Sequence, residues 1–238
     1  MKGVILAGGF GTRLNGTAKA LLDINGKPVL EHILSRISNL VDKTFIVTNG
    51  LYFRDFKKWH RNYNGNITIF NNNVMNHESR KGSIGDLNYI LNEGTVDDLL
   101  VIGSDNLFED SLNGMIEEHK KKNATIIGLY DVMDISEASK MGVPFLKENR
   151  LVGLCEKPEI PKSTIISTFI YIIDIKDLSR VKEYAEDNSK DKKAMDKMGY
   201  LINHLAGTSD VYGVRLEGKW FDVGSLESLE RARREFSF

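Results

Sequence analysis

Two cations lie beside a glycine-rich loop near the start of the chain, and this combination of residues can bind phosphate groups. Gly8, Gly9 and Gly11 follow a short apolar run, and Arg13 and Lys19 flank the same loop. Glycines allow backbone N–H groups to approach an anion or a flat base closely. The two cations could clamp a polyphosphate and neutralise the charge that develops on it. The competing interpretation is a tight turn with two solvated surface cations.

Two familiar phosphate-binding patterns do not fit this loop. The dinucleotide fingerprint needs a third glycine, but counting from Gly9 and Gly11 places Leu14 at that position. The phosphate loop of nucleoside triphosphatases needs a lysine after its second glycine, whereas Gly16 is followed by Thr17. The loop therefore belongs to another class of nucleotide site, or it is a plain turn.

A carboxylate lies where ligands bind in open α/β sheets. Asp105 follows the apolar run 99–102, at the C-terminal end of the strand that this run predicts. A divalent cation that neutralises a triphosphate needs oxygen ligands of this kind. Taken alone, Asp105 is better explained as a loop carboxylate or a helix cap.

Strands and helices must alternate in the first half of the chain to position these residues. Short apolar runs bounded by glycines and polar residues predict buried strands, whereas apolar residues at helical spacing predict helices. Strands are expected at 4–7, 45–47, 67–70, 99–102 and 125–129, and helices at 28–37, 51–59, from 85 onward, and at 115–122. This alternation predicts right-handed βαβ units and a mostly parallel sheet.

The pattern becomes richer in strands after residue 130. Strands are expected at 143–146, 151–154 and 165–173, helices at 177–186 and 195–205, and a last strand pair before a helix at 226–236. We therefore predict one Rossmann-like α/β domain over residues 1–238, with a mixed, mostly parallel sheet in three αβα layers. Its first half would be 1–130 and its β-rich half 131–238.

The composition excludes several classes of protein. The 238 residues carry 32 Lys and Arg against 33 Asp and Glu, which argues against bulk electrostatic binding to nucleic acid or membrane surfaces. A single cysteine cannot form an internal disulfide, and no run approaches the roughly 20 apolar residues of a membrane span. We expect a soluble, cytoplasmic protein.

The order of motifs resembles the opening of the sugar-1-phosphate nucleotidyltransferases, the family of glucose-1-phosphate thymidylyltransferase and mannose-1-phosphate guanylyltransferase. The residues that carry this resemblance are 6–14, 19–22 and 26–28. It implies the GT-A-like fold of nucleotide-diphospho-sugar transferases, with a nucleotide-binding half at 1–130 and a sugar-phosphate-binding, acceptor half at 131–238. It also implies that Arg13 and Lys19 contact phosphates during transfer. The residues that would wrap the nucleoside triphosphate are Leu6, Ala7, Gly8, Gly9, Gly11 and Thr12.

The resemblance also implies a magnesium site. Residues 103–106 are similar to the family's Gly-Asp-Asn with Ser104 inserted, and 220–224 resemble its Trp-x-Asp-x-Gly. By this likeness Asp105 and Asp222 hold Mg²⁺. The stretch before Lys19 is shorter than is usual in the family, and Ala18 stands where proline is common.

Later motifs resemble the family's sugar-phosphate site. Glu156 would accept hydrogen bonds from sugar hydroxyls, and Lys157 would pair with the sugar phosphate. Gly142, Thr168 and Tyr171 also match positions near the sugar. Taken alone, a Glu-Lys pair is a common surface feature.

Two departures from the family lie close to the expected substrates. Residues 81–87 resemble the segment that lines the base pocket, where Gly82 and Ser83 would contact the nucleotide, but Asp86 replaces a small residue. Phe169 replaces a glycine, so its ring is expected to narrow or alter the sugar pocket.

The resemblance implies a magnesium-dependent transfer of a nucleotidyl group from a nucleoside triphosphate to a sugar 1-phosphate. Glucose-1-phosphate thymidylyl or uridylyl transfer is favoured, with mannose-1-phosphate guanylyl transfer as an alternative. A cytidylyltransferase for an alcohol phosphate such as phosphocholine or inositol phosphate is a further alternative, which the short loop before Lys19 supports and the motif at 156–158 argues against. A non-catalytic nucleotide-sugar-binding regulatory subunit is the alternative of another class. Homo-oligomers are common in the family, and the sequence leaves self-association open.

Overall fold

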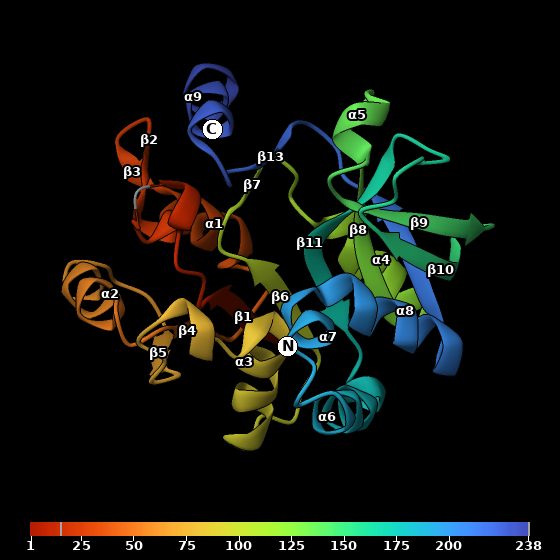
Figure 1. The fold of residues 1–238 in the computed structure, drawn as a ribbon, viewed down its shortest axis with the longest axis horizontal. Helices are drawn as coiled ribbons and strands as arrows, with labels where there is room; N and C mark the ends of the chain where they lie inside the picture. Colours follow the sequence, from red (N-terminus) through yellow and green to blue (C-terminus); the bar gives the residue numbers. More distant parts are fainter. Residues whose placement is uncertain (15, 238) are drawn as a thin grey trace.

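One large mixed sheet forms the centre of the protein in the computed structural model, which describes residues 1–14 and 16–237, without the side chain of Arg13. Its strands, in spatial order, are β5 (Ile67–Asn71), β4 (Lys43–Thr48), β1 (Lys2–Ala7), β6 (Leu99–Gly103), β11 (Ile165–Ile173), β8 (Thr125–Asp131), β12 (Val211–Arg215), β10 (Arg150–Glu156) and β9 (Gly142–Lys147). Figure 1 shows the first half of the chain, in red to yellow, beside the second half in green to blue.

The first half of the sheet is parallel, as the alternation of strands and helices predicted. β1 pairs in parallel with β4 and β6, and β4 pairs in parallel with β5. In register, Ala7 lies opposite Thr48, Leu6 opposite Gly103, and Thr48 opposite Asn71. The C-terminal ends of these four strands are therefore level at one edge of the sheet, which is where ligands bind in folds of this kind.

The second half of the sheet is mainly antiparallel, which the prediction of a mostly parallel sheet did not anticipate. β11 runs antiparallel to both β6 and β8, and β10 runs antiparallel to β12 and β9. The expected last strand pair is also different, because its two members do not pair with each other. β12 joins β8 in parallel in the large sheet, while the other strand, β13 (Trp220–Asp222), pairs with β7 (Asn106–Phe108).

Helices cover both faces of the sheet, so the three-layer prediction is confirmed. The helices are α1 (Val29–Ile37), α2 (Phe53–His60), α3 (Gly82–Asn92), α4 (Asn113–Lys122), α5 (Ile135–Ala138), α6 (Leu178–Asp187), α7 (Lys192–Asp196), α8 (Met198–Thr208) and α9 (Leu226–Glu235). Short 3-10 turns occupy Thr12–Leu14, Lys19–Leu21, His77–Ser79 and Ile175–Asp177, and β2 (Asp23–Ile24) pairs with β3 (Lys27–Pro28).

Within the described ranges, no helix is long and apolar enough to cross a membrane.

The core divides between the two faces because successive strand residues point in opposite directions. On β1, Ile5 belongs to the cluster that also contains Leu30 of α1, whereas Val4 belongs to the cluster that contains Leu87 of α3. Both strand residues are fully buried. The apolar run of β1 is therefore continuous because each face of the strand is covered.

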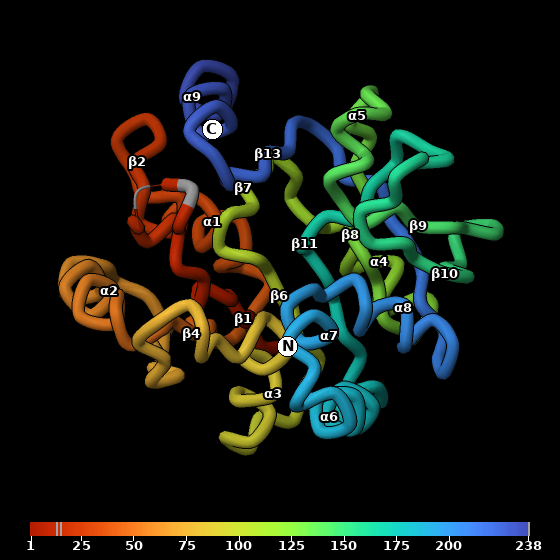
Figure 2. Tube along the Cα trace, viewed as in Figure 1, coloured from red at the N-terminus to blue at the C-terminus, as the bar shows by residue number. Residues whose placement is uncertain are grey.

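The region 195–205, predicted as one helix, is broken at Lys197 into α7 and α8. In Figure 2 the trace of α7 lies next to α3, and the two helices are in contact. This contact brings the second half of the chain against the start of α3, part of the segment 81–87 that the family resemblance assigns to the base pocket.

Candidate active site

The glycine loop follows β1 at the level edge of the sheet and is held by the neighbouring strand end. Asn49, directly after β4, donates from Nδ2 to the carbonyl oxygens of Gly8 and Gly9 at 3.1 and 3.3 Å. The Tyr52 hydroxyl lies 2.8 Å from the carbonyl oxygen of Phe10 and 2.6 Å from that of Gly16. The loop is thereby fixed before any ligand arrives, which is what a phosphate or base site requires.

A cleft of about 180 Å³ opens between this loop and the start of α3. Eight residues predicted from the sequence to bind nucleotide, phosphate or metal line it: Leu6, Ala7, Gly8, Gly9, Lys19, Gly82, Ser83 and Asp105. We call it the nucleotide cleft.

A cation and a carboxylate meet at one end of the nucleotide cleft. Lys19 Nζ donates to Asp105 Oδ2 at 2.9 Å, and both side chains are partly exposed, at 24% and 27%. The two residues are 86 positions apart in sequence, and the level strand ends bring them together. An ammonium group here can neutralise phosphate charge without a rearrangement.

The small β7–β13 sheet explains how the second carboxylate reaches Asp105. Asn106 opposes Asp222 in this antiparallel pair, and the Val223 N–H donates to the carbonyl oxygen of Asp105 at 2.8 Å. The buried Asn106 Oδ1 accepts from the Trp220 indole N–H at 2.9 Å, which fixes the strand ends against each other. Asp105 and Asp222 consequently line one cavity, and their oxygen donors suit Mg²⁺.

A second cavity of about 220 Å³ adjoins the nucleotide cleft and shares Asp105, Phe169 and Asp196 with it. We call it the acceptor cavity. The sequence-predicted residues that line it are Asp105, Gly142, Glu156, Lys157, Tyr171 and Asp222.

Glu156 is the last residue of β10, and its side chain reaches the N-terminus of α8. A carboxylate in this place is stabilised by the helix dipole. Its carboxylate approaches Gly199 so closely that a Cβ there would collide with Oε1. Burial raises the pKa of Glu156, while Lys197, Lys157 and a hydrogen bond from the Gly199 N–H act in the opposite direction. Burial also raises the pKa of Tyr171 well above its usual range, so its hydroxyl stays protonated.

Lys157 has a left-handed backbone with φ of 49°, which is uncommon for a lysine. Its N–H donates to the carbonyl oxygen of Met141 at 2.9 Å directly after β10 ends. Strained residues of this kind cluster at functional sites, and the side chain of Lys157 lines the acceptor cavity.

Three predicted residues of the described part of the chain line neither cavity. Gly11, with φ of 56°, and the exposed Thr12 belong to the loop but do not line either cavity in the described part of the chain. Thr168 is buried in β11, and its hydroxyl donates to the carbonyl oxygen of Gly128 in the neighbouring β8 at 2.9 Å. Its hydrogen bond therefore links two strands of the sheet. The side chain of Arg13 lies outside the described part of the structure.

Phe169 stands between the two cavities and lines both. Its ring packs over Gly103, where a Cβ would lie 2.6 Å from Cδ1, and lies 5.6 Å from the Tyr171 ring between centroids. That this ring narrows the sugar pocket or alters its preference stays a prediction.

Segment 80–83 is tied to the junction of α7 and α8. The Arg80 guanidinium pairs with Asp196 at 3.1 Å, and Ser83 Oγ donates to the Asp196 carbonyl oxygen at 2.9 Å. Gly82 has φ of 75°, and a Cβ there would collide with the carbonyl oxygen of Met195. Only a glycine therefore allows this close approach.

Asp86 and Asn72 are site residues whose roles the sequence did not predict. Asn72 Nδ2 donates to Asp86 Oδ1 at 2.7 Å, both side chains are 4% exposed, and both line the nucleotide cleft. Burial raises the pKa of Asp86 to about 6, although the hydrogen bond from Asn72 and the charge of Lys81 both act to lower it. Asn49 and Asn72 directly follow β4 and β5. Ligands bind at the C-terminal ends of parallel strands, and this rule, which identified Asp105, would also have identified both asparagines.

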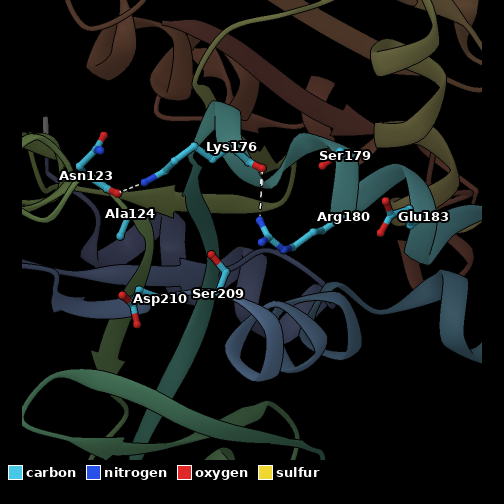
Figure 3. A pocket seen from close by; sticks show the side chains of 8 residues that line it. All are labelled: Asn123, Ala124, Lys176, Ser179, Arg180, Glu183, Ser209 and Asp210. Atoms are coloured by element: carbon cyan, nitrogen blue, oxygen red, sulfur yellow. Dashed lines mark hydrogen bonds between the residues drawn. The ribbon is translucent and has the colours of Figure 1, made fainter.

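A different cluster of possible metal ligands lies at the opposite edge of the sheet. Asp98, His119 and Asp174 can bring ligand atoms within 4.8 Å of one another, but Asp98 precedes β6 and Asp174 follows β11 at the far end of both strands. The cavity near this edge is lined by Asn123, Ala124, Lys176, Ser179, Arg180, Glu183, Ser209 and Asp210 (Figure 3). There, Lys176 Nζ donates to the carbonyl oxygen of Asn123, and Arg180 donates to that of Lys176. These residues are separate from the candidate active site.

Comparison with known proteins decides the family. The model of the family described as nucleotidyl transferase matches residues 2–237. The chain belongs to this family. Its mixed sheet, the glycine loop after β1 and the two adjoining cavities are thereby features of a nucleotidyltransferase.

Similar proteins are known both by sequence and by structure. The bifunctional protein GlmU of Methanocaldococcus jannaschii is 30% identical over 232 residues, covering 94% of this chain and 51% of the relative, so the chain spans about half that protein's length. A candidate glucose-1-phosphate thymidylyltransferase of Bacillus anthracis, solved with sucrose, has a TM-score of 0.86 at 25% identity, covering 100% of this chain and 97% of that one. A UDP-glucose pyrophosphorylase with UDP-glucose has a TM-score of 0.83 at 20% identity, covering 98% and 97%, and shows the fold.

Proposed function

We propose that this nucleotidyltransferase joins a nucleoside triphosphate to a sugar 1-phosphate and releases pyrophosphate. The observation that carries the proposal is the pair of adjoining cavities that meet at Asp105, beside Lys19. One cavity has the glycine loop that suits a nucleotide, and the other has the carboxylate and lysine that suit a sugar phosphate. The reacting phosphorus would lie where the two cavities join.

In the proposed reaction, an oxygen of the sugar phosphate attacks the α-phosphorus in line, and the bond to pyrophosphate breaks. The attacking phosphate needs no general base, because its second pKa lies near 6. Lys157 orients this phosphate, and Glu156 accepts hydrogen bonds from the sugar hydroxyls. Lys19 neutralises charge on the triphosphate, and we assign a similar role to Arg13. Catalysis rests on positioning and charge stabilisation.

We propose that Asp105 and Asp222 hold Mg²⁺ when the substrates are bound. The metal would supply charge neutralisation of the triphosphate oxygens. The two carboxylates line one cavity and are aligned by the β7–β13 pairing, which supports this assignment.

Glucose 1-phosphate is the first acceptor to test, because the names of both structural neighbours refer to glucose compounds. We also propose a cytoplasmic location, which the single cysteine supports because it cannot form an internal disulfide.

Pyrophosphate release tests this function. Five nucleoside triphosphates are each combined with glucose 1-phosphate, mannose 1-phosphate, phosphocholine and inositol phosphate in the presence of Mg²⁺. Asp222→Asn should lower the turnover of the best pair by at least about 100-fold, because a metal ligand is lost, and its melting temperature should stay close to that of the wild type. Asp187→Asn, on the exposed end of α6, is the matched control. Activity with no pair would favour a binding subunit, and near-normal turnover of Asp222→Asn would overturn the metal assignment.

A further inference from the structure

The nucleotide cleft contains a buried carboxylate with one unused oxygen. Asp86 Oδ1 accepts from Asn72, but among the described residues no hydrogen bond reaches Oδ2, although the side chain is only 4% exposed. Oδ2 lies against Gly8, where a Cβ would collide with it. Asp86 lines the cleft, so Oδ2 can accept a hydrogen bond from a donor that arrives with the ligand.

The negative charge of Asp86 argues against a phosphate as the ligand group that meets Oδ2. The phosphate-binding end is marked by Lys19 and Asp105, after β6. Asn72 follows β5, and the Asp86 carboxylate reaches from α3 to Gly8, which follows β1, the neighbour of β6 in the strand order. The Asn72–Asp86 pair therefore lies on the β5 side of Lys19 and Asp105, and we expect the base of a nucleotide to extend to that side.

We propose that Asp86 reads the base of the nucleotide, together with Asn72, and favours a base that carries an exocyclic amino group over uracil and thymine. This inference rests on the proposed function, because it concerns the nucleotide of that same site. It also departs from the neighbours, whose names refer to thymidylyl transfer and to UDP.

Hydrogen-bond complementarity is the reason for this preference. Asp86 Oδ2 can only accept, whereas the second N–H of the Asn72 amide can only donate. Cytosine offers an amino donor beside a ring-nitrogen acceptor, and guanine offers N–H donors beside a carbonyl oxygen, so both satisfy the pair. In uracil and thymine the single ring N–H lies between two carbonyl oxygens, and a carboxylate that approaches it meets one of them. Carboxylates accept from the cytosine amino group in the same way in nucleic-acid recognition.

The electrostatics of Asp86 supports a ligand role. The raised pKa of Asp86 shows that the Asn72 hydrogen bond and the Lys81 charge only partly offset the cost of burying its charge. Proteins keep such groups where function requires them. No ion pair of Asp86 within 4.0 Å is present among the described residues, so a structural salt bridge does not explain it.

Equilibrium binding, measured without any acceptor, tests this inference apart from catalysis. CTP, GTP, ATP, UTP and dTTP, each with Mg²⁺, are titrated calorimetrically into the full chain. The best amino-bearing nucleotide should bind about 10- to 100-fold more tightly than UTP and dTTP. In Asp86→Asn, whose amide can donate, this ratio should fall by at least tenfold and UTP should gain affinity. Glu93→Gln, exposed at the end of the same helix, should keep the wild-type ratio.

The possible failures are distinguishable. Binding of no nucleotide at all would overturn the proposed function. Binding of every nucleotide with equal affinity would show that Asp86 does not discriminate among the bases, and tightest binding of UTP or dTTP would show that it does not favour an amino group. Either result overturns this inference and leaves the proposed function standing. The wild-type comparison decides even if Asp86→Asn does not fold.

Discussion

Replacing Asp86 by asparagine removes a buried charge while keeping the shape of the side chain and the acceptor for Asn72. The pKa of Asp86 rises from 3.8 to about 6 on folding. A difference of about two units corresponds to about 3 kcal/mol at 1.36 kcal/mol per unit. Below pH 3.8 the carboxyl is protonated in both the folded and unfolded states and costs nothing. Above pH 6 it is ionised in both, and burial of the charge destabilises the folded state by the full amount.

We therefore expect Asp86→Asn to be more stable than the wild type at pH 7.5, by up to about 3 kcal/mol. For a chain of this size this is a rise in melting temperature of about 6–12 °C. The difference should grow between pH 4 and pH 6 and then level off. Calorimetric melting of both proteins from pH 4 to pH 8 measures it, and the other carboxyl groups cancel because both chains share them. A difference that does not change with pH would refute the electrostatic reasoning.

Two glycine substitutions test the close approaches that shape the site. In Gly199→Ala the new methyl group would collide with Glu156 Oε1 and displace that carboxylate. The KM for the sugar phosphate should therefore rise by about tenfold or more. An unchanged KM would show that Glu156 does not bind the acceptor. Gly82→Ala meets the Met195 carbonyl oxygen at a positive φ, so the free energy of unfolding should fall by at least about 1–3 kcal/mol. Gly207→Ala, in α8 with open space around it, is the matched control and should stabilise by about 0.5–1 kcal/mol. Equal stability of the two alanine variants at 82 and 207 would contradict the steric argument.

The parallel half of the fold could be predicted from sequence because its signals are local. The run that contains Ile5 is apolar on both faces, and the glycine loop after it marks the strand end. The direction of β11 could not be predicted in this way. Its run is equally compatible with parallel and antiparallel pairing, since periodicity reports burial and not direction. β11 pairs antiparallel with β6 after a long connection, residues 104–164, so the direction depends on how that whole segment folds.

The candidate site was predictable where residues follow a strand and not where they depend on a distant partner. Asp105 follows β6, and the rule for strand ends identified it. Asp222 was identified only by the family resemblance, because its proximity to Asp105 depends on the short β7–β13 pairing. Asp86 looked like an unexplained departure from the family until its contacts with Asn72 and Gly8 placed it in the nucleotide cleft.

The junction of α7 and α8 lines both the nucleotide cleft and the acceptor cavity. Asp196 lines both cavities and is held by Arg80 on the nucleotide side, while the next helix begins two residues later and holds Glu156 on the acceptor side. A shift of this junction when one proposed substrate fills its cavity would alter the other cavity, and the resulting change in affinity would be equal in both directions. We therefore expect the affinities for nucleotide and for acceptor to be linked, so each should be measured at a stated concentration of the other.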